Sequence, residues 1–152
     1  NLSVLQNLRC ANNELVTIPI GLDQIKTLST LVLSHNRIEF FPVLSCHQLR
    51  ILDLRENKLL DTINLSLMIS LQQVFLSFNP LNRAQLQFSD ISSSSSSSSQ
   101  SITVARSSLT KSPISTIVEL HISNAYLYML PEDIGLLHVM HTLDVSNNEL
   151  TD

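Results

Sequence analysis

Histidine and cysteine side chains are the first candidates for chemistry in this 152-residue chain, because they can ligate metals or act as nucleophiles. His138 and His141 stand three residues apart, a spacing at which two imidazoles can share one metal ion. No nearby carboxylate or thiol completes a tetrahedral set, and Cys10 and Cys46 each stand alone in the sequence. We therefore expect solvated histidines, cysteines that fill space in a core, and neither a metal site nor a cofactor.

The sequence also lacks the motifs of common catalytic and nucleotide-binding loops. Gly21 and Gly135 are the only glycines, whereas phosphate-binding loops need several clustered glycines to bring backbone N–H groups onto a phosphate. No G-x-S-x-G motif presents a nucleophilic serine. A net charge of -4 offers no basic surface to nucleic acid, and the uncharged stretch 62–82 has periodic rather than continuous leucines. These features predict a protein that is not an enzyme, binds no nucleic acid and does not insert into membranes.

The leucines belong to a motif that recurs along the chain. In its first copy, Leu5, Leu8, Cys10, Asn13 and Leu15 occupy positions 1, 4, 6, 9 and 11. Apolar residues recur at positions 1, 4, 6 and 11, and asparagine recurs at position 9 in every copy but the fifth. The six copies, which we call repeats 1 to 6, start at Leu5, Leu28, Leu49, Leu71, Ile117 and Met140. Consecutive starts are 21 to 23 residues apart, except that 46 residues, or two periods, separate the starts of repeats 4 and 5.

This pattern resembles the leucine-rich repeat family, whose motif is L-x-x-L-x-L-x-x-N-x-L with a period of about 20 to 29 residues. The phrases from Ile18 to Leu22 and from Leu130 to Gly135 are similar to the typical intracellular subclass. The resemblance implies an α/β solenoid shaped as a horseshoe, with a parallel sheet of six or seven strands on its concave face. It also implies a protein partner, without naming one.

The spacing predicts the local structure on physical grounds as well. Positions 4 and 6 are two residues apart, so a strand points both into the core and points positions 5 and 7 outward. One repeat cannot bury its leucines alone, so neighbouring repeats must stack. The amide at position 9 can donate and accept where the strand ends, and the family forms an asparagine ladder there, which Ala125 in repeat 5 cannot join. Strands are expected near residues 8 to 11, 31 to 34, 52 to 55, 74 to 77, 120 to 123 and 143 to 146.

Composition divides the chain into three parts. Residues 1–88 hold repeats 1 to 4, and residues 114–152 hold repeats 5 and 6, of which the last stops before its convex segment and indicates a truncated C-terminus. Residues 89–113 include eight consecutive serines, Ser92–Ser99, which have no apolar side chain to bury and should form a mobile loop away from the sheet. Because 102–113 also matches a degenerate repeat, this middle part is either an insertion or a further repeat with a seventh strand.

The concave face is the candidate binding surface, because its side chains are not needed for the core. Its centre combines an arginine and two phenylalanines, residue types that often anchor protein interfaces. Phe75 or Phe78 can instead pack against neighbouring side chains, and that alternative stays open. The predicted contact residues are Arg9, His35, Asp53, Arg55, Glu56, Phe75, Phe78, Glu119, His121 and Asp144.

The predicted function is therefore binding of a partner protein along the concave face. Two alternatives are a structural subunit of a large assembly and the recognition domain of a longer multidomain signalling enzyme. Two isolated cysteines favour a reducing, cytoplasmic compartment. An extracellular location is the alternative, because the triplets that begin at Asn1 and Asn64 match the glycosylation sequon.

Overall fold

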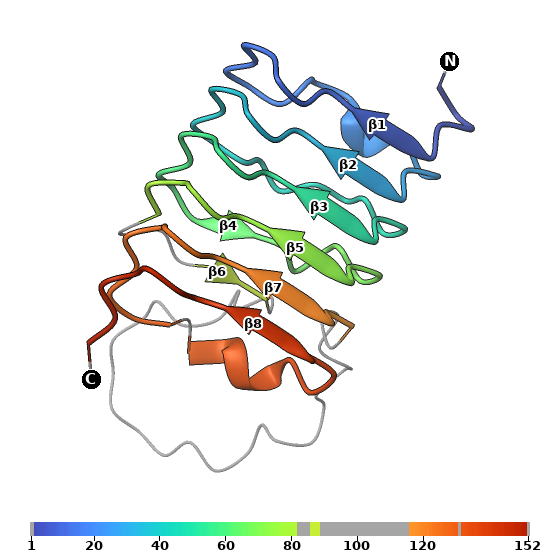
Figure 1. The fold of residues 1–152 in the computed structure, drawn as a ribbon. Helices are drawn as coiled ribbons and strands as arrows, with labels where there is room; N and C mark the ends of the chain where they lie inside the picture. The colour runs from blue at the N-terminus through green and yellow to red at the C-terminus, as the bar shows by residue number, and fades with distance from the viewer. Residues whose placement is uncertain (1, 82–85, 89–115, 131, 152) are drawn as a thin grey trace, which may run out of the picture.

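Six short strands form one parallel sheet along the length of the molecule (Figure 1). The computed structural model describes residues 2–81, 86–88, 116–130 and 132–151. Neighbours in the sheet follow the order of the chain, and each repeat contributes one strand, so the described residues form a β-solenoid. The strands are β1 (Asn7–Arg9), β2 (Thr30–Val32), β3 (Ile51–Asp53), β5 (Gln73–Phe75), β7 (Glu119–His121) and β8 (Thr142–Asp144).

The register of the sheet keeps equivalent repeat positions side by side. Leu8 of β1 is aligned with Leu31 of β2, and position 4 stays aligned through all six strands. The strands cover positions 3 to 5, so they begin one residue before the predicted segments and end before them. Interstrand hydrogen bonding continues past these bounds, since the Leu33 N–H donates to the Asp53 carbonyl at 2.8 Å. The predicted parallel sheet of six strands is confirmed.

The core lies behind the sheet and is built from the inward positions of the repeats. Leu31, Leu33, Leu52 and Leu54 at positions 4 and 6 are fully buried, as are their counterparts in repeats 4 and 5. Each of these side chains is covered by the repeats on both sides, whereas Leu143 on β8 remains 38% exposed. Burial therefore depends on stacking between repeats, as the spacing of the apolar residues predicts.

The segments that return behind the sheet contain little regular structure (Figure 1). Among the described residues they form two 3-10 helices, η1 (Leu22–Gln24) and η2 (Glu132–Leu136), and no α-helix. Strands β4 (Ile63–Asn64) and β6 (Leu86–Gln87) pair in parallel as a second, two-stranded sheet that was not predicted. The α/β class is thus not confirmed, because the described returning segments form 3-10 turns, two short strands and irregular structure.

Several predictions concern residues outside the described ranges. The serine run 92–99, the boundaries of the middle part at 89 and 113, and the seventh strand all lie there. In the described sheet, β5 pairs directly with β7, and Val74 is aligned with Leu120. No helix in the described part of the chain is long and apolar enough to cross a membrane.

Candidate functional site

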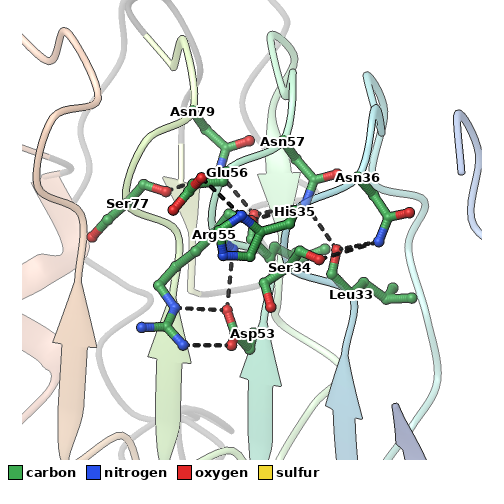
Figure 2. A network of polar contacts seen from close by, with 11 residues as sticks. Leu33, Ser34, His35, Asn36, Asp53, Arg55, Glu56, Asn57, Ser77 and Asn79 are labelled. Atoms are coloured by element: carbon green, nitrogen blue, oxygen red, sulfur yellow. Dashed lines mark hydrogen bonds and ion pairs between the residues drawn. The ribbon is translucent and has the colours of Figure 1, made fainter. Parts of the chain in front are cut away.

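A ladder of buried asparagine side chains holds the ends of the strands together, as the sequence predicts (Figure 2). Asn57 Nδ2 donates to the carbonyl of Leu54 in its own repeat and to that of Leu33 in the preceding repeat, each at 3.0 Å. Its Oδ1 accepts from the N–H of Ile38 at 3.0 Å. Asn36, Asn79 and Asn148 make equivalent bonds. Each of these four asparagines therefore satisfies backbone groups in two repeats, which fixes where its own strand leaves the sheet.

Ala125 interrupts this ladder, and nearby groups supply the missing hydrogen bonds. By analogy with the other repeats, the N–H of Leu81 would donate to an asparagine at position 125, but it donates to the Asn79 carbonyl at 2.8 Å instead. On the other side, Asn148 Oδ1 accepts from Ala125 N–H at 2.9 Å and from Leu127 N–H at 3.1 Å. Repeat 5 thus lacks one side-chain amide, while the backbone groups on both sides of the gap keep partners.

The backbone at position 8 adopts a left-handed conformation in all six repeats. Here φ lies between 53° and 60°, where asparagine is favoured among non-glycine residues and bulky side chains are disfavoured. The residues in this column are Asn12, His35, Glu56, Phe78, Asn124 and Asn147. Phe78 is the bulkiest of them, and its side chain gains no local hydrogen bond that would favour this conformation.

We call the outward surface of the six-stranded sheet, together with this left-handed column, the sheet face. Every predicted contact residue lies on it, in four columns formed by positions 3, 5, 7 and 8. Position 5 aligns Arg9, Asp53, Phe75, His121 and Asp144, with Val32 between the first two. The remaining contact residues are Glu119 at position 3, Arg55 at position 7, and His35, Glu56 and Phe78 at position 8.

Asp53 and Arg55 form a two-pronged ion pair at the centre of the sheet face (Figure 2). Arg55 Nε donates to Asp53 Oδ1 at 3.0 Å, and a terminal guanidinium nitrogen donates to Oδ2 at 2.7 Å. The Asp53 side chain is only 7% exposed, while that of Arg55 is 49% exposed. The hydrogen bond to Asp53 raises the pKa of Arg55. This pair neutralises a buried carboxylate, so Arg55 has a structural role in addition to its exposed edge.

Phe75 lies between two side chains of the same face. The Arg55 guanidinium lies over its ring, 5.1 Å from the centroid, and the His121 ring stacks against it at 5.0 Å with an interplanar angle of 25°. His121 Nδ1 is 3.7 Å from Asp144 Oδ2. Hydrogen bonds from the Ser146 hydroxyl and N–H lower the pKa of Asp144. A continuous chain of contacts therefore runs from Asp53 on β3 to Asp144 on β8, and Phe75 packs against its neighbours.

The other predicted contact residues differ in their solvent exposure and in whether they form ion pairs. His35 Nδ1 is 2.8 Å from Glu56 Oε2, and both side chains are about half exposed. Phe78 is 53% exposed, so of the two phenylalanines it is the one open to solvent. Arg9 on β1 and Glu119 on β7 make no ion pair within the described ranges. The structure thus brings seven of the ten residues into three ion pairs and one aromatic stack, and the other three have no such contact with the part of the chain that it describes.

The structure places three of the histidine and cysteine candidates, His138, His141 and Cys46. His138 and His141 are exposed beside the last strand, and the described residues contain no group of three or more side chains suited to hold a metal ion. Cys46 is 2% exposed and lies 3.8 Å from the Leu22 carbonyl. Burial raises the pKa of its thiol, which favours the protonated form over the reactive thiolate.

Serine side chains contribute to the face in a way that sequence reasoning missed. The Ser77 and Ser123 hydroxyls are 3.0 Å apart, and Ser77 Oγ also accepts from the Ser123 N–H. Both occupy position 7, as does Ser146, which fixes the Asp144 carboxylate. The signal was present as a serine at the same position of four repeats, the other being Ser34.

Comparisons with known proteins identify no family for this chain. No protein-family model matches it, and no curated protein matches it significantly. The assignment of a function therefore rests on the fold and on the geometry of the sheet face.

Proposed function

We propose that this chain is a leucine-rich repeat protein that binds a partner protein through the sheet face and carries out no catalysis. The recurring motif and the asparagine ladder support the family assignment, because both follow that family's pattern residue by residue. In this proposal the protein works in the cytoplasm, where its two free cysteines stay reduced.

The contrast between the two sides of the sheet is the observation that carries the proposal. The inward positions repeat nearly the same aliphatic side chains, as stacking requires. The outward position 5 changes in every strand, from arginine through valine, aspartate, phenylalanine and histidine to aspartate. Stability does not call for such variety, whereas recognition of one partner requires specific, unlike contacts.

Site-specific photo-crosslinking tests the proposal. A photoreactive phenylalanine analogue replaces Phe78 on the sheet face or, as a matched aromatic control, Phe40, which is 54% exposed and lies beyond the strands. In the cells that naturally make the protein, we expect a discrete protein adduct at position 78 and none at position 40. Adducts confined to position 40 would place the binding surface elsewhere and contradict the proposal.

A further inference from the structure

The charges of the sheet face are unequally distributed between its two ends. Across its four columns the face carries two arginines, Arg9 and Arg55, against four carboxylates, those of Asp53, Glu56, Glu119 and Asp144. Arg55 is paired with Asp53, so Arg9 on the first strand is the arginine of this face that has no ion pair among the described residues. The excess acids lie toward the last strands, with Glu119 on β7 and Asp144 on β8.

The acidic end has the geometry to receive a cation from outside. His121 is aligned with Asp144, and Glu119 stands two residues before His121 on the same strand. Glu119 and Asp144 are therefore diagonal neighbours on one face, with Cα atoms roughly 8 Å apart from the usual strand spacing and rise, so one Lys or Arg side chain can reach both carboxylates. Glu119 has no cationic partner among the described residues. Asp144 accepts hydrogen bonds from Ser146, and the one basic side chain that pairs with it among those residues is the imidazole of His121.

The same face exposes an apolar side chain close to its acidic end. Phe78 is 53% exposed on repeat 4, next to repeat 5, which carries Glu119. With a spacing of about 4.8 Å between strands and about 3.3 Å per residue along them, Phe78 lies roughly 14 to 17 Å from Asp144 and Glu119. An extended segment covers that distance in about four or five residues.

From this charge distribution we infer that the partner presents an extended, basic segment, in which a Lys or Arg side chain meets Glu119 and Asp144 and an apolar side chain about four or five residues away meets Phe78. The inference rests on the proposed function and names the chemistry of its partner. Complementary charge sets the orientation and the association rate of the segment, and the apolar contact slows its release. The ring of Phe75 already contacts Arg55 and His121 and is only partly exposed, so Phe78 is the more accessible of the two phenylalanines.

Selection from a displayed library of random dodecapeptides tests the inference with a defined probe. We expect the enriched peptides to carry Lys or Arg about four or five residues from an aromatic or aliphatic side chain. The affinity of a representative peptide should fall about tenfold or more in the double variant Glu119→Gln/Asp144→Asn, and it should weaken as salt increases. Glu39→Gln is the matched control, because Glu39 is exposed and lies off the sheet face, so its substitution should leave the affinity unchanged.

The outcomes separate the inference from the proposed function. Enriched peptides that are acidic or neutral, or that bind the Glu119→Gln/Asp144→Asn variant as tightly as the parent, overturn the basic-segment inference. If those peptides still lose affinity in Phe78→Ser, the sheet face remains the binding surface. An absence of enriched peptides, or binding that no sheet-face variant weakens, counts against both. Circular dichroism and urea unfolding of each variant establish that the fold is retained.

Discussion

The ion pair between Asp53 and Arg55 allows a double-substitution test of whether the centre of the sheet face is structural. The neighbouring repeat offers natural replacements, because Val32 and Ser34 occupy the same positions one repeat earlier. Three variants are compared with the parent protein: Asp53→Val, Arg55→Ser, and the two together. The first and second each leave one charge without its partner, while the third leaves neither.

The expected losses follow from the different burial of the two charges. Arg55→Ser removes two charged hydrogen bonds from a carboxylate that is 7% exposed and leaves it one bond, from the residue-55 N–H at 3.1 Å. Breaking a fully buried pair costs about 3 to 5 kcal/mol. In the parent protein the guanidinium is half exposed, so solvent already screens this pair, and its loss should cost about 2 kcal/mol. Asp53→Val leaves a guanidinium that water can solvate, so it should cost under about 1 kcal/mol. The double variant should lose only about 0.5 to 1 kcal/mol, mainly the contact of Arg55 with Phe75.

Urea unfolding followed by circular dichroism measures the free energy of unfolding of all four proteins, provided that the slopes with urea agree. We expect the double variant to be more stable than Arg55→Ser alone, with a coupling of about 1.5 kcal/mol between the two sites. Losses that simply add would show that the two charges do not stabilise one another, and Arg55 would then be free to serve a partner alone.

Three further predictions concern the core, the ladder and the acid limit of stability. Leu54→Ala should reduce the free energy of unfolding by about 2 to 5 kcal/mol, because the side chain is fully buried, and a urea-unfolding loss under about 1 kcal/mol would contradict its place in the core. Asn57→Ala should reduce the free energy of unfolding by about 2 to 3 kcal/mol in the same assay, because its amide bonds two repeats. The control Asn13→Ala should cost under about 1 kcal/mol, because the exposed Asn13 amide bonds only its own repeat. Equal losses would argue against the ladder. The pKa of Asp144 is lowered in the folded protein. Ionised Asp144 therefore contributes fully to the free energy of unfolding above its unfolded-state pKa of about 3.9, and this contribution is lost as the pH falls through its folded-state pKa. Ser146→Ala should flatten the fall in thermal stability below pH 4, and an unchanged profile would show that this hydroxyl does not hold Asp144 ionised.

The repeating part of the fold was predictable, because stacking makes one physical requirement recur in every copy. Leucines at positions 4 and 6 must share a face, and that periodicity alone indicates the strand, its direction and its neighbours. The hydrogen-bonding role of the asparagine at position 9 was predictable for the same reason. The α-helical content was not, because the returning segments are held by many individual contacts rather than by a period. The pairing of β4 with β6 joins residues 63 and 86, which the motif does not align.

The candidate site was predictable only as a set of outward positions. The sequence places Asp53, Arg55 and Phe75 on one face, but whether an outward side chain meets solvent or its neighbour depends on rotamers and on distances of a few ångströms. Asp53 illustrates this limit, since its side chain is nearly buried although its position points away from the core. Phe75 and Phe78 differ for the same reason. Phe75 contacts the flat side chains of Arg55 and His121, whereas Phe78, whose own backbone is left-handed, makes no ring or cation contact with the described residues.

The position of Phe78 shows how a repeated backbone can separate stability from recognition. The left-handed turn at position 8 is present in all six repeats, including repeat 5, where Ala125 stands in place of the ladder asparagine, so it forms with several different side chains at that position. Asparagine, which tolerates that conformation best, fills three of the six positions, and a phenylalanine there costs about 1 kcal/mol or more without local compensation. The ladder offsets that cost, because Asn79 directly after Phe78 is 1% exposed and donates to carbonyls in two repeats. A strained, exposed aromatic residue is thus held rigidly at the edge of the sheet face, and a partner that covers it encounters a side chain whose backbone is already ordered.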